Sequence, residues 1–292
     1  MNRRTESRSE TLAVRGLRYH VRHWGPADAP AVFLLHGWMD SSPTFQFLVD
    51  ALRQEWHLIA PDWRGYGESE WLGRPYWFPD YYGDLDALLA HYSPARPARL
   101  VGHSMGANIA AIFASARPQR VAQVAMLDFL GLPATAAQDA PKQLAQWLDH
   151  LGETPRLNSY ADHAALQRRM QQINPRLDDD KAAFLARALG RTLPDGRVQM
   201  ACDPWHRVPS PVLYRIDDQL ACWQAIAAPV LMLEATDGFV HERFGADPAE
   251  RERRLAAFRN LQLATIADCG HNLHHDQPER VAAALETFLT RD

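Results

Sequence analysis

The sequence predicts an α/β fold in which helices cover a mostly parallel β-sheet. Short apolar runs typical of buried strands alternate with helical patterns up to about residue 129, and the strand pattern resumes at Pro229. The chain has 292 residues, of which 47% are hydrophobic. That length can bury a large core, and it suits one large domain with an insertion.

The first section of the chain supplies strands and helices in alternation. The apolar run at 31–35 is typical of a buried strand, and the alanine-rich stretch at 107–116 is typical of a helix. Further segments in the same rhythm are 17–23, 44–51, 57–60 and 81–91. This alternation is typical of strands joined by crossover helices, so most strands are predicted to run parallel.

Residues Gly102 to Gly106 form a G-x-S-x-G motif between the apolar run 99–101 and the alanine-rich helix. A nucleophile elbow requires this order of strand, sharp turn and helix, and the two glycines let strand and helix approach closely. Negative charge that develops at the serine oxygen meets free N–H groups and the positive end of the helix dipole. We therefore predict that Ser104 is a nucleophile.

A second glycine signal follows the strand predicted at 31–35, where Gly37 and Trp38 come shortly after its end. Gly37 allows a tight turn that directs the next backbone N–H toward the space over Ser104. An oxyanion hole of this kind takes one N–H from this loop and one from the residue after the nucleophile. We expect these donors to be the backbone N–H groups of Trp38 and Met105.

The predicted general base lies near the C-terminus. His271 follows the apolar run 263–267 on a glycine-containing loop, and a helical pattern over 279–289 comes after it. A histidine on a loop after a late strand can fold back onto the serine, take its proton and pass it to the leaving group. The chain has 13 histidines. We expect His36 and His103 to orient loops without transferring protons.

Together these motifs resemble the α/β-hydrolase family, and they occur in family order over most of the chain. The segments that carry the resemblance are 36–38, 61–69, 102–106, 118–121 and 270–281. The resemblance implies an eight-stranded, mostly parallel sheet flanked by helices, with a helical cap inserted after the sixth strand. The serine at the elbow is similar to that of capped bacterial serine esterases. It differs from the dehalogenase and epoxide-hydrolase branches, which place an aspartate there.

Two aspartates compete for the third position of a catalytic triad. Most family members carry this acid after the seventh strand, and counting from Pro229 its position falls on Gly238, one residue beyond Asp237. Asp128 ends the sixth-strand run 121–127, in a setting that resembles a minority arrangement in some haloalkane dehalogenases. Either carboxylate can accept the histidine Nδ1–H and stabilise the imidazolium. We favour Asp128 and keep Asp237 as the alternative.

The alternation of strands and helices stops between residues 130 and 226, and this segment is predicted to form a helical cap. Its helical patterns cover 141–151, 161–171 and 179–189. The α/β core then comprises 1–129 and 227–292. An insertion at this place lies above the carboxyl ends of the strands, where ligands bind in open α/β sheets.

Three tryptophans of the predicted cap are candidates for substrate binding. Trp147, Trp205 and Trp223 could line an apolar pocket. Aromatic residues at such spacing can instead pack the cap onto the core, and for any one of them we favour this packing role.

Composition argues against several classes of protein. The formal net charge is −4 and no basic stripe is present, so no nucleic-acid partner is expected. No apolar run reaches the length of a membrane span, and residues 1–10 lack the apolar core of a signal peptide. These features predict a soluble, cytoplasmic protein. The sequence leaves its oligomeric state open.

Cofactors and metals are not expected either. The cysteines, Cys202, Cys222 and Cys269, lack the spacing of a disulfide framework or a metal site. The acidic run 178–180 precedes a helix, where it favours the helix N-terminus, and no calcium-binding loop surrounds it. No dinucleotide fingerprint is present.

The expected activity is hydrolysis of a small-molecule carboxylic ester, through an acyl-enzyme and with an apolar acyl group of short to medium length. Two alternatives remain. Similar machinery can hydrolyse a carbon–carbon bond in a carboxylated substrate, provided that Arg64, Arg168 or Arg215 points inward. A hydrolase-like binding protein of the same fold would keep the triad and turn over slowly.

Overall fold

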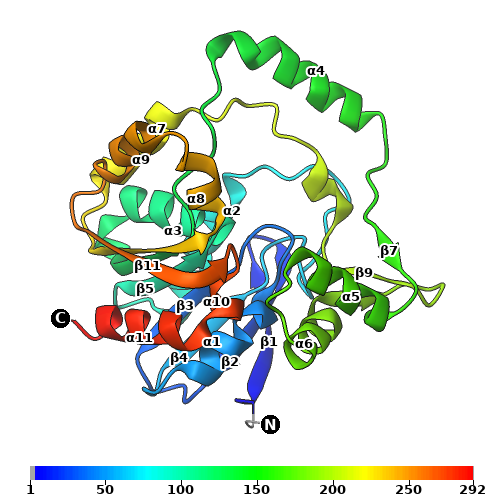
Figure 1. Cartoon of the computed structure of the whole chain (residues 1–292), viewed down its shortest axis with the longest axis horizontal. Helices are drawn as coiled ribbons and strands as arrows, with labels where there is room; N and C mark the ends of the chain where they lie inside the picture. Colours follow the sequence, from blue (N-terminus) through cyan, green and yellow to red (C-terminus); the bar gives the residue numbers. More distant parts are fainter. Residues whose placement is uncertain (1–3, 292) are drawn as a thin grey trace.

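The computed structural model describes residues 4–291 and confirms the predicted α/β fold, with an eight-stranded sheet at its centre (Figure 1). The strand order is β1-β2-β4-β3-β5-β6-β10-β11. The strands are β1 (Ser7–Val14), β2 (Leu17–Trp24), β3 (Ala31–Leu35), β4 (His57–Pro61), β5 (Ala98–His103), β6 (Val121–Leu127), β10 (Val230–Asp237) and β11 (Leu261–Gly270). Strand β2 is antiparallel to both of its neighbours, and the other pairs are parallel.

Both faces of the central strands are buried. Successive side chains of a strand point to opposite faces, so alternate residues belong to different hydrophobic clusters. In β3, Phe33 and Leu35 join one hydrophobic cluster, whereas Val32 and Leu34 join the other. This explains why the strand is apolar throughout rather than alternating with polar residues. One hydrophobic core on each face of the sheet therefore holds the strand ends, and the loops that follow them, in place.

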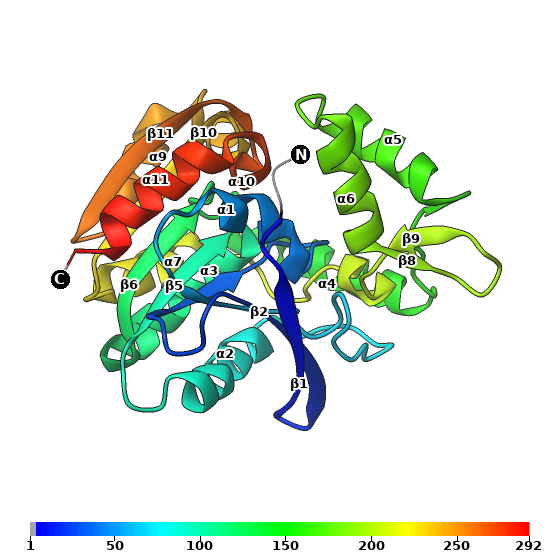
Figure 2. The same ribbon diagram turned by 90° about the horizontal axis from the view of Figure 1, so that it is seen from below.

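Helices cover the two faces of the sheet (Figure 2). Side chains of α2 (Asp80–Tyr92), α3 (Met105–Ala116), α7 (Ile216–Ala225) and α8 (Phe239–Phe244) join the cluster that contains Phe33, and α9 (Pro248–Leu255) packs beside α8. The opposite face carries α1 (Gln46–Ala51), α10 (Leu273–Asp276) and α11 (Pro278–Leu289). Short 3-10 turns occupy Ser42–Phe45, Pro118–Arg120, Ala137–Asp139 and Pro204–Arg207.

The segment between β6 and β10 contains the three helices expected there. They are α4 (Ala140–Leu151), α5 (His163–Ile173) and α6 (Asp179–Leu189). The segment also holds a small antiparallel sheet of β7 (Ser159–Tyr160), β9 (Val198–Met200) and β8 (Gly190–Thr192), which the sequence did not predict. Strands of two or three residues are too short for a visible period of two.

The end of the predicted cap belongs structurally to the core layer. Helix α7 packs on α3, and its Trp223 is fully buried and stacked on Phe258. Helix α4 is the opposite case: none of its described side chains is buried, and it stands apart from the rest of the molecule (Figure 1). Within residues 4–291, no helix combines the length and apolarity that a membrane span needs.

Candidate active site

Ser104 lies on the turn between β5 and α3, in a strained backbone conformation with φ 51° and ψ −115°. A positive φ is uncommon outside glycine, and it clusters at functional sites where the surroundings enforce it. The flanking glycines provide those surroundings. A Cβ at Gly102 would collide with the backbone of residues 106–107, and a Cβ at Gly106 would collide with the carbonyl of Leu35. Strand β5, helix α3 and strand β3 can therefore approach only because both positions lack a side chain.

The loop after β3 lies directly against the nucleophile turn. A Cβ at Gly37 would stand 3.3 Å from the Cβ of Ser104 and 3.0 Å from Nδ1 of His103. Trp38 and Met105 border the same cavity as Ser104. The backbone N–H groups of these two residues donate no hydrogen bond within residues 4–291. They are therefore available to an oxygen placed above the serine.

His271 and Asp128 meet beside the serine. Nδ1 of His271 lies 2.7 Å from Oδ2 of Asp128, and the His271 ring borders the cavity together with Ser104. Asp128 is fully buried after the end of β6, and its backbone also has a positive φ of 49°. Its carboxylate accepts hydrogen bonds from the backbone N–H groups of Ala235 at 3.2 Å and Phe239 at 2.6 Å. These donors fix the carboxylate in the orientation that faces the imidazole.

Gly238 explains how an acid from β6 reaches this position. A Cβ at Gly238 would overlap the carboxylate of Asp128. The usual family position of the acid is therefore filled by a carboxylate that arrives from the neighbouring strand, and a side chain at 238 has no room.

Asp237, the alternative acid, is placed elsewhere. Its carboxylate hydrogen-bonds and ion-pairs with Arg176, and its side chain is 58% exposed. Within residues 4–291, Nδ1 of His271 has no carboxylate partner other than Asp128. In the structure, Asp128 rather than Asp237 lies against His271.

A cavity of about 590 Å³ opens above Ser104, and its walls are mainly aromatic. The aromatic lining residues are Trp38, Tyr66, Tyr76, Phe78, Tyr81, Phe129, Trp205 and Phe239. Of the three tryptophans expected here, only Trp205 is among the lining residues that the structure describes. Trp223 is buried against Phe258 in the core, and Trp147 lies partly exposed on α4 and is absent from the described lining of the cavity.

One wall of the cavity is a three-ring stack that sequence reasoning missed. The His206 ring is sandwiched between Tyr66, at 3.9 Å, and Tyr76, at 3.7 Å between centroids. Burial lowers the pKa of His206 to about 3, so this ring is neutral and packs as an aromatic. A Cβ at Gly65 would overlap both His206 and Tyr76. The only sequence signal was the tyrosine and glycine content of the 61–69 loop. The stack itself could not be predicted, because His206 lies far from both tyrosines in the chain.

His36, next to Gly37 in the loop after β3, has structural hydrogen-bond partners. Nε2 of His36 accepts a hydrogen bond from the backbone N–H of Trp63 at 2.9 Å, and Nδ1 donates to the Gly37 carbonyl at 2.8 Å. Burial lowers the pKa of His36 to about 4. The ring is therefore neutral and joins the loops after β3 and β4.

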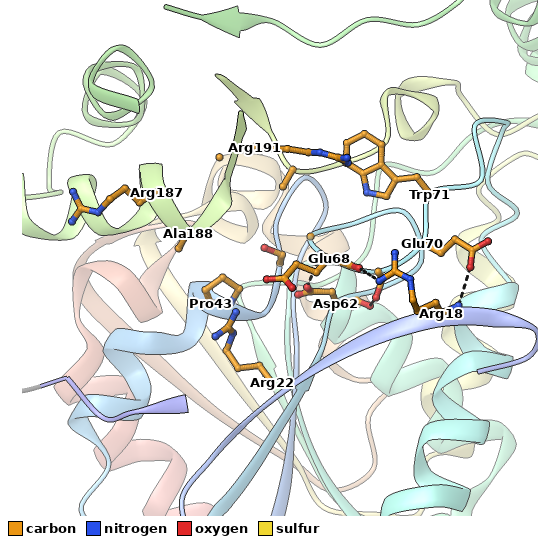
Figure 3. Close-up of a pocket in the computed structure, with 15 residues that line it drawn as sticks. Arg18, Arg22, Pro43, Asp62, Glu68, Glu70, Trp71, Arg187, Ala188 and Arg191 are labelled. Atoms are coloured by element: carbon orange, nitrogen blue, oxygen red, sulfur yellow. Dashed lines mark hydrogen bonds between the residues drawn. The ribbon is translucent and has the colours of Figure 1, made fainter. Parts of the chain in front are cut away.

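A second cavity of about 660 Å³ lies between the core and the segment that carries α6 and β8 (Figure 3). Arg187 and Arg191 border it from that segment, and Arg18 and Arg22 border it from β2; the Arg187 side chain points away from the other labelled residues. Three acidic residues, Asp62, Glu68 and Glu70, also border it. Ser104 does not border this cavity, so we do not place the chemistry there despite its larger volume.

Comparison with known proteins agrees with this architecture. The family model of the alpha/beta hydrolase fold matches residues 30–278, and the chain belongs to that family. A serine hydrolase-like protein of Danio rerio is 29% identical over 91% of this chain and 83% of its own length. Lipase LipV of Mycobacterium tuberculosis is 26% identical over 92% of this chain and 97% of its own length.

Solved structures show the same fold. The thioesterase domain from the curacin biosynthetic pathway superimposes with a TM-score of 0.85, covering 97% of this chain and 99% of that domain. Its sequence identity is 23%, so this likeness concerns the fold alone. Serine hydrolase-like, lipase and esterase relatives support a hydrolase.

Proposed function

We propose that this protein is a serine hydrolase that cleaves carboxylic esters through an acyl-enzyme. The observation that carries the proposal is the 2.7 Å contact between His271 Nδ1 and the buried Asp128 carboxylate, beside the strained Ser104 turn. A carboxylate at Nδ1 holds the imidazole in the tautomer whose Nε2 is free to accept a proton. Strain, a buried orienting acid and a shared cavity are the features of an activated serine.

The reaction follows from these positions. As the Ser104 oxygen attacks the acyl carbon, His271 takes the hydroxyl proton and Asp128 stabilises the resulting imidazolium. The oxyanion is held by the backbone N–H groups of Trp38 and Met105. The imidazolium then gives its proton to the alkoxide leaving group, and the acyl group remains on the serine. A water molecule repeats the sequence, releasing the acid and restoring the serine.

The cavity supports an apolar acyl group. Its aromatic walls stabilise apolar surface, and 590 Å³ lies within the usual range for small-molecule sites. We also propose that residues 130–226, apart from helix α7, act as a cap over this cavity, and that Trp205 is the one of its three tryptophans that contacts substrate. The short to medium acyl length predicted from the sequence remains part of this proposal.

The test is a panel of p-nitrophenyl esters of increasing acyl length, run beside labelling with a fluorophosphonate probe. We expect saturable turnover and one label per chain, on Ser104. Labelling that persists in Ser104→Ala would refute the assignment of the nucleophile. An acyl burst equal to the enzyme concentration, followed by negligible turnover, would instead show a slow-turnover binding protein.

A second candidate substrate class, esters or ketones that carry a carboxylate, rests on Arg243. Arg243 is the one lysine or arginine among the described lining residues of the cavity. Its guanidinium lies 4.1 Å from the centre of the Phe239 ring and makes no hydrogen bond or ion pair within residues 4–291. An unpaired guanidinium in an aromatic wall is suited to a carboxylate.

The three arginines considered from the sequence do not serve this role. Arg64 is buried and bound by Asp84 and Asp80, and Arg215 pairs with Asp218 on the surface. Arg168 is exposed on α5 and is absent from the described lining of the cavity.

Arg243→Gln separates the two classes. For the mono-p-nitrophenyl ester of a dicarboxylic acid, losing a charge-assisted hydrogen bond should raise KM about 10-fold or more. The matched neutral ester should change little. Equal KM changes for both esters would remove the case for an anionic substrate and leave the neutral ester as the substrate class.

A further inference from the structure

Behind the nucleophile turn, a cluster of three metal-ligating side chains remains without an assigned role. Asp40, His103 and His274 each contribute one ligand atom, and these atoms all lie within 4.8 Å of one another. The histidines are buried, and Asp40 is partly exposed. The rings of His103 and His274 are 4.6 Å apart between centroids. None of the three takes part in the proton transfers described above.

The tautomer of His103 leaves a lone pair directed into this cluster. Its Nε2 lies 3.0 Å from the carbonyl oxygen of His271, and since a carbonyl can only accept, Nε2 carries the hydrogen. Burial and the neighbouring His271 hold the pKa of His103 well below its usual value, so the ring is neutral. Nδ1 is therefore a bare acceptor, and it has no hydrogen-bond partner within residues 4–291.

His274 is arranged in the same way. Its Nε2 lies 3.1 Å from Oγ1 of Thr44, and Nε2 of His275 lies 2.7 Å from the same oxygen. When this hydroxyl oxygen accepts the Nε2–H of His274, Nδ1 of His274 is left with a bare lone pair. Burial holds the pKa of His274 well below its usual value, and its Nδ1 likewise finds no partner in the described part of the chain.

Asp40 adds a carboxylate to these two unpartnered imidazole nitrogens. Its carboxylate accepts the backbone N–H of Ser41 at 2.9 Å but forms no ion pair within residues 4–291. A water that donates to both imidazoles would turn its own lone pairs toward this carboxylate. A cation satisfies all three groups at once.

We propose that Asp40, His103 and His274 form a binding site for a divalent transition-metal ion, with Zn²⁺ as its best match. Two neutral imidazoles and one carboxylate are typical zinc ligands. The other nitrogen of each histidine is held by a carbonyl or a hydroxyl, as is usual for metal-binding imidazoles. Bond lengths of about 2.0–2.2 Å require ligand atoms closer together than 4.8 Å, so the side chains must move inward by about 1 Å on binding.

The ion would join three loops of the proposed catalytic site. Asp40 follows the oxyanion loop, His103 precedes Ser104, and His274 lies three residues after His271. Because His103 donates to the carbonyl of His271, ligation at its Nδ1 polarises the ring and strengthens that hydrogen bond. The site positions these loops and does not touch substrate. Binding should therefore raise Tm in a concentration-dependent manner.

The experiment titrates the chelator-stripped full-length protein with Zn²⁺ by calorimetry and follows Tm. We expect one equivalent to bind and Tm to rise. Asp40→Asn keeps the shape but removes the charge, and it should weaken binding by at least about 10–100-fold. His91→Ala, at an exposed histidine of α2, is the matched control and should bind as the wild type does.

His271→Ala identifies which histidines hold the ion, since Zn²⁺ can also bind a catalytic imidazole. The proposal requires that this variant still bind one equivalent. Loss of binding in His271→Ala with retention in Asp40→Asn would overturn it, as would the absence of stoichiometric binding to the wild type. If the wild type binds no stoichiometric Zn²⁺, a water molecule and a proton satisfy the three side chains instead.

A measurement on the wild type keeps the proposal testable if a variant does not fold. Long-range ¹H–¹⁵N spectra of the imidazoles should show Zn²⁺-dependent shifts of Nδ1 in His103 and His274, with no matching shift in His91. Unchanged Nδ1 signals for both cluster histidines at saturating Zn²⁺ would overturn the site.

Discussion

The floor of the proposed catalytic cavity and the segment proposed to cover it differ in how tightly they are packed. On the floor, Ser104 and Asp128 follow neighbouring strands β5 and β6, both with a positive φ that their surroundings enforce. Above it, α4 exposes Leu144, Leu148 and Leu151, and no described residue of that helix is buried. The backbone of the floor is thus fixed at both residues, whereas α4 is held by few contacts.

This difference in packing suggests a division of tasks, with the chemistry on the tightly packed floor and the recognition of substrate in the loosely packed segment above it. Strained residues persist only where the rest of the structure over-determines them, so the floor must be rigid. A loosely packed covering segment can change in sequence without disturbing the fold. Substitutions on the two sides should therefore differ sharply in their effects on activity and stability.

The largest effect is expected for the nucleophile and the base. Ser104→Ala and His271→Ala should each lower kcat by several orders of magnitude, approaching about 10⁶-fold, because triad residues act as a unit. The double variant should be little worse than either single variant. Steady-state hydrolysis of a p-nitrophenyl ester measures this, and additive losses in the double variant would contradict a shared role.

The choice of acid is expected to have the next largest effect. Asp128→Asn should preserve the fold and lower kcat by a factor approaching about 10⁴, because the amide favours the wrong imidazole tautomer. Asp237→Asn is the matched control, since its carboxylate is 58% exposed and bound to Arg176. The reverse ranking of the two variants would reject Asp128 as the orienting acid.

A smaller loss is expected when the carboxylate is displaced rather than neutralised. Gly238→Ala places a methyl group where the Asp128 carboxylate lies, and it must shift that group away from His271. Misplacement by about 1 Å can cost about 10²-fold in kcat.

The control for this variant is Gly152→Ala at the end of α4. There a Cβ meets its nearest atom at 3.4 Å, an ordinary contact. The control should keep wild-type kcat. Equal kcat values for the two glycine variants would show that Gly238 is not needed to seat the acid.

The same contrast explains what could be predicted from the sequence. Gly102 and Gly106 stand where close backbone approach leaves no room for a side chain, so a local motif marked the turn that carries Ser104. The choice between Asp128 and Asp237 depended on the neighbouring strand, which local spacing does not encode. The position of Trp223 was likewise decided by tertiary packing on Phe258. The partners of His274 come from loops more than 150 residues away, so the sequence showed no metal-like spacing.

The smallest effect is expected on the apolar face of α4. Leu148 is 54% exposed there, so Leu148→Ala should change the free energy of unfolding by no more than about 0.5 kcal/mol. Leu285→Ala is the matched comparison, because Leu285 lies in helix α11 at 1% exposure and its loss should cost about 2–5 kcal/mol. Denaturant unfolding of both variants measures the difference. If Leu148→Ala cost as much as Leu285→Ala, the apolar face of α4 would have to be packed in solution, and the covering segment would close more tightly over the cavity than the contacts of α4 indicate.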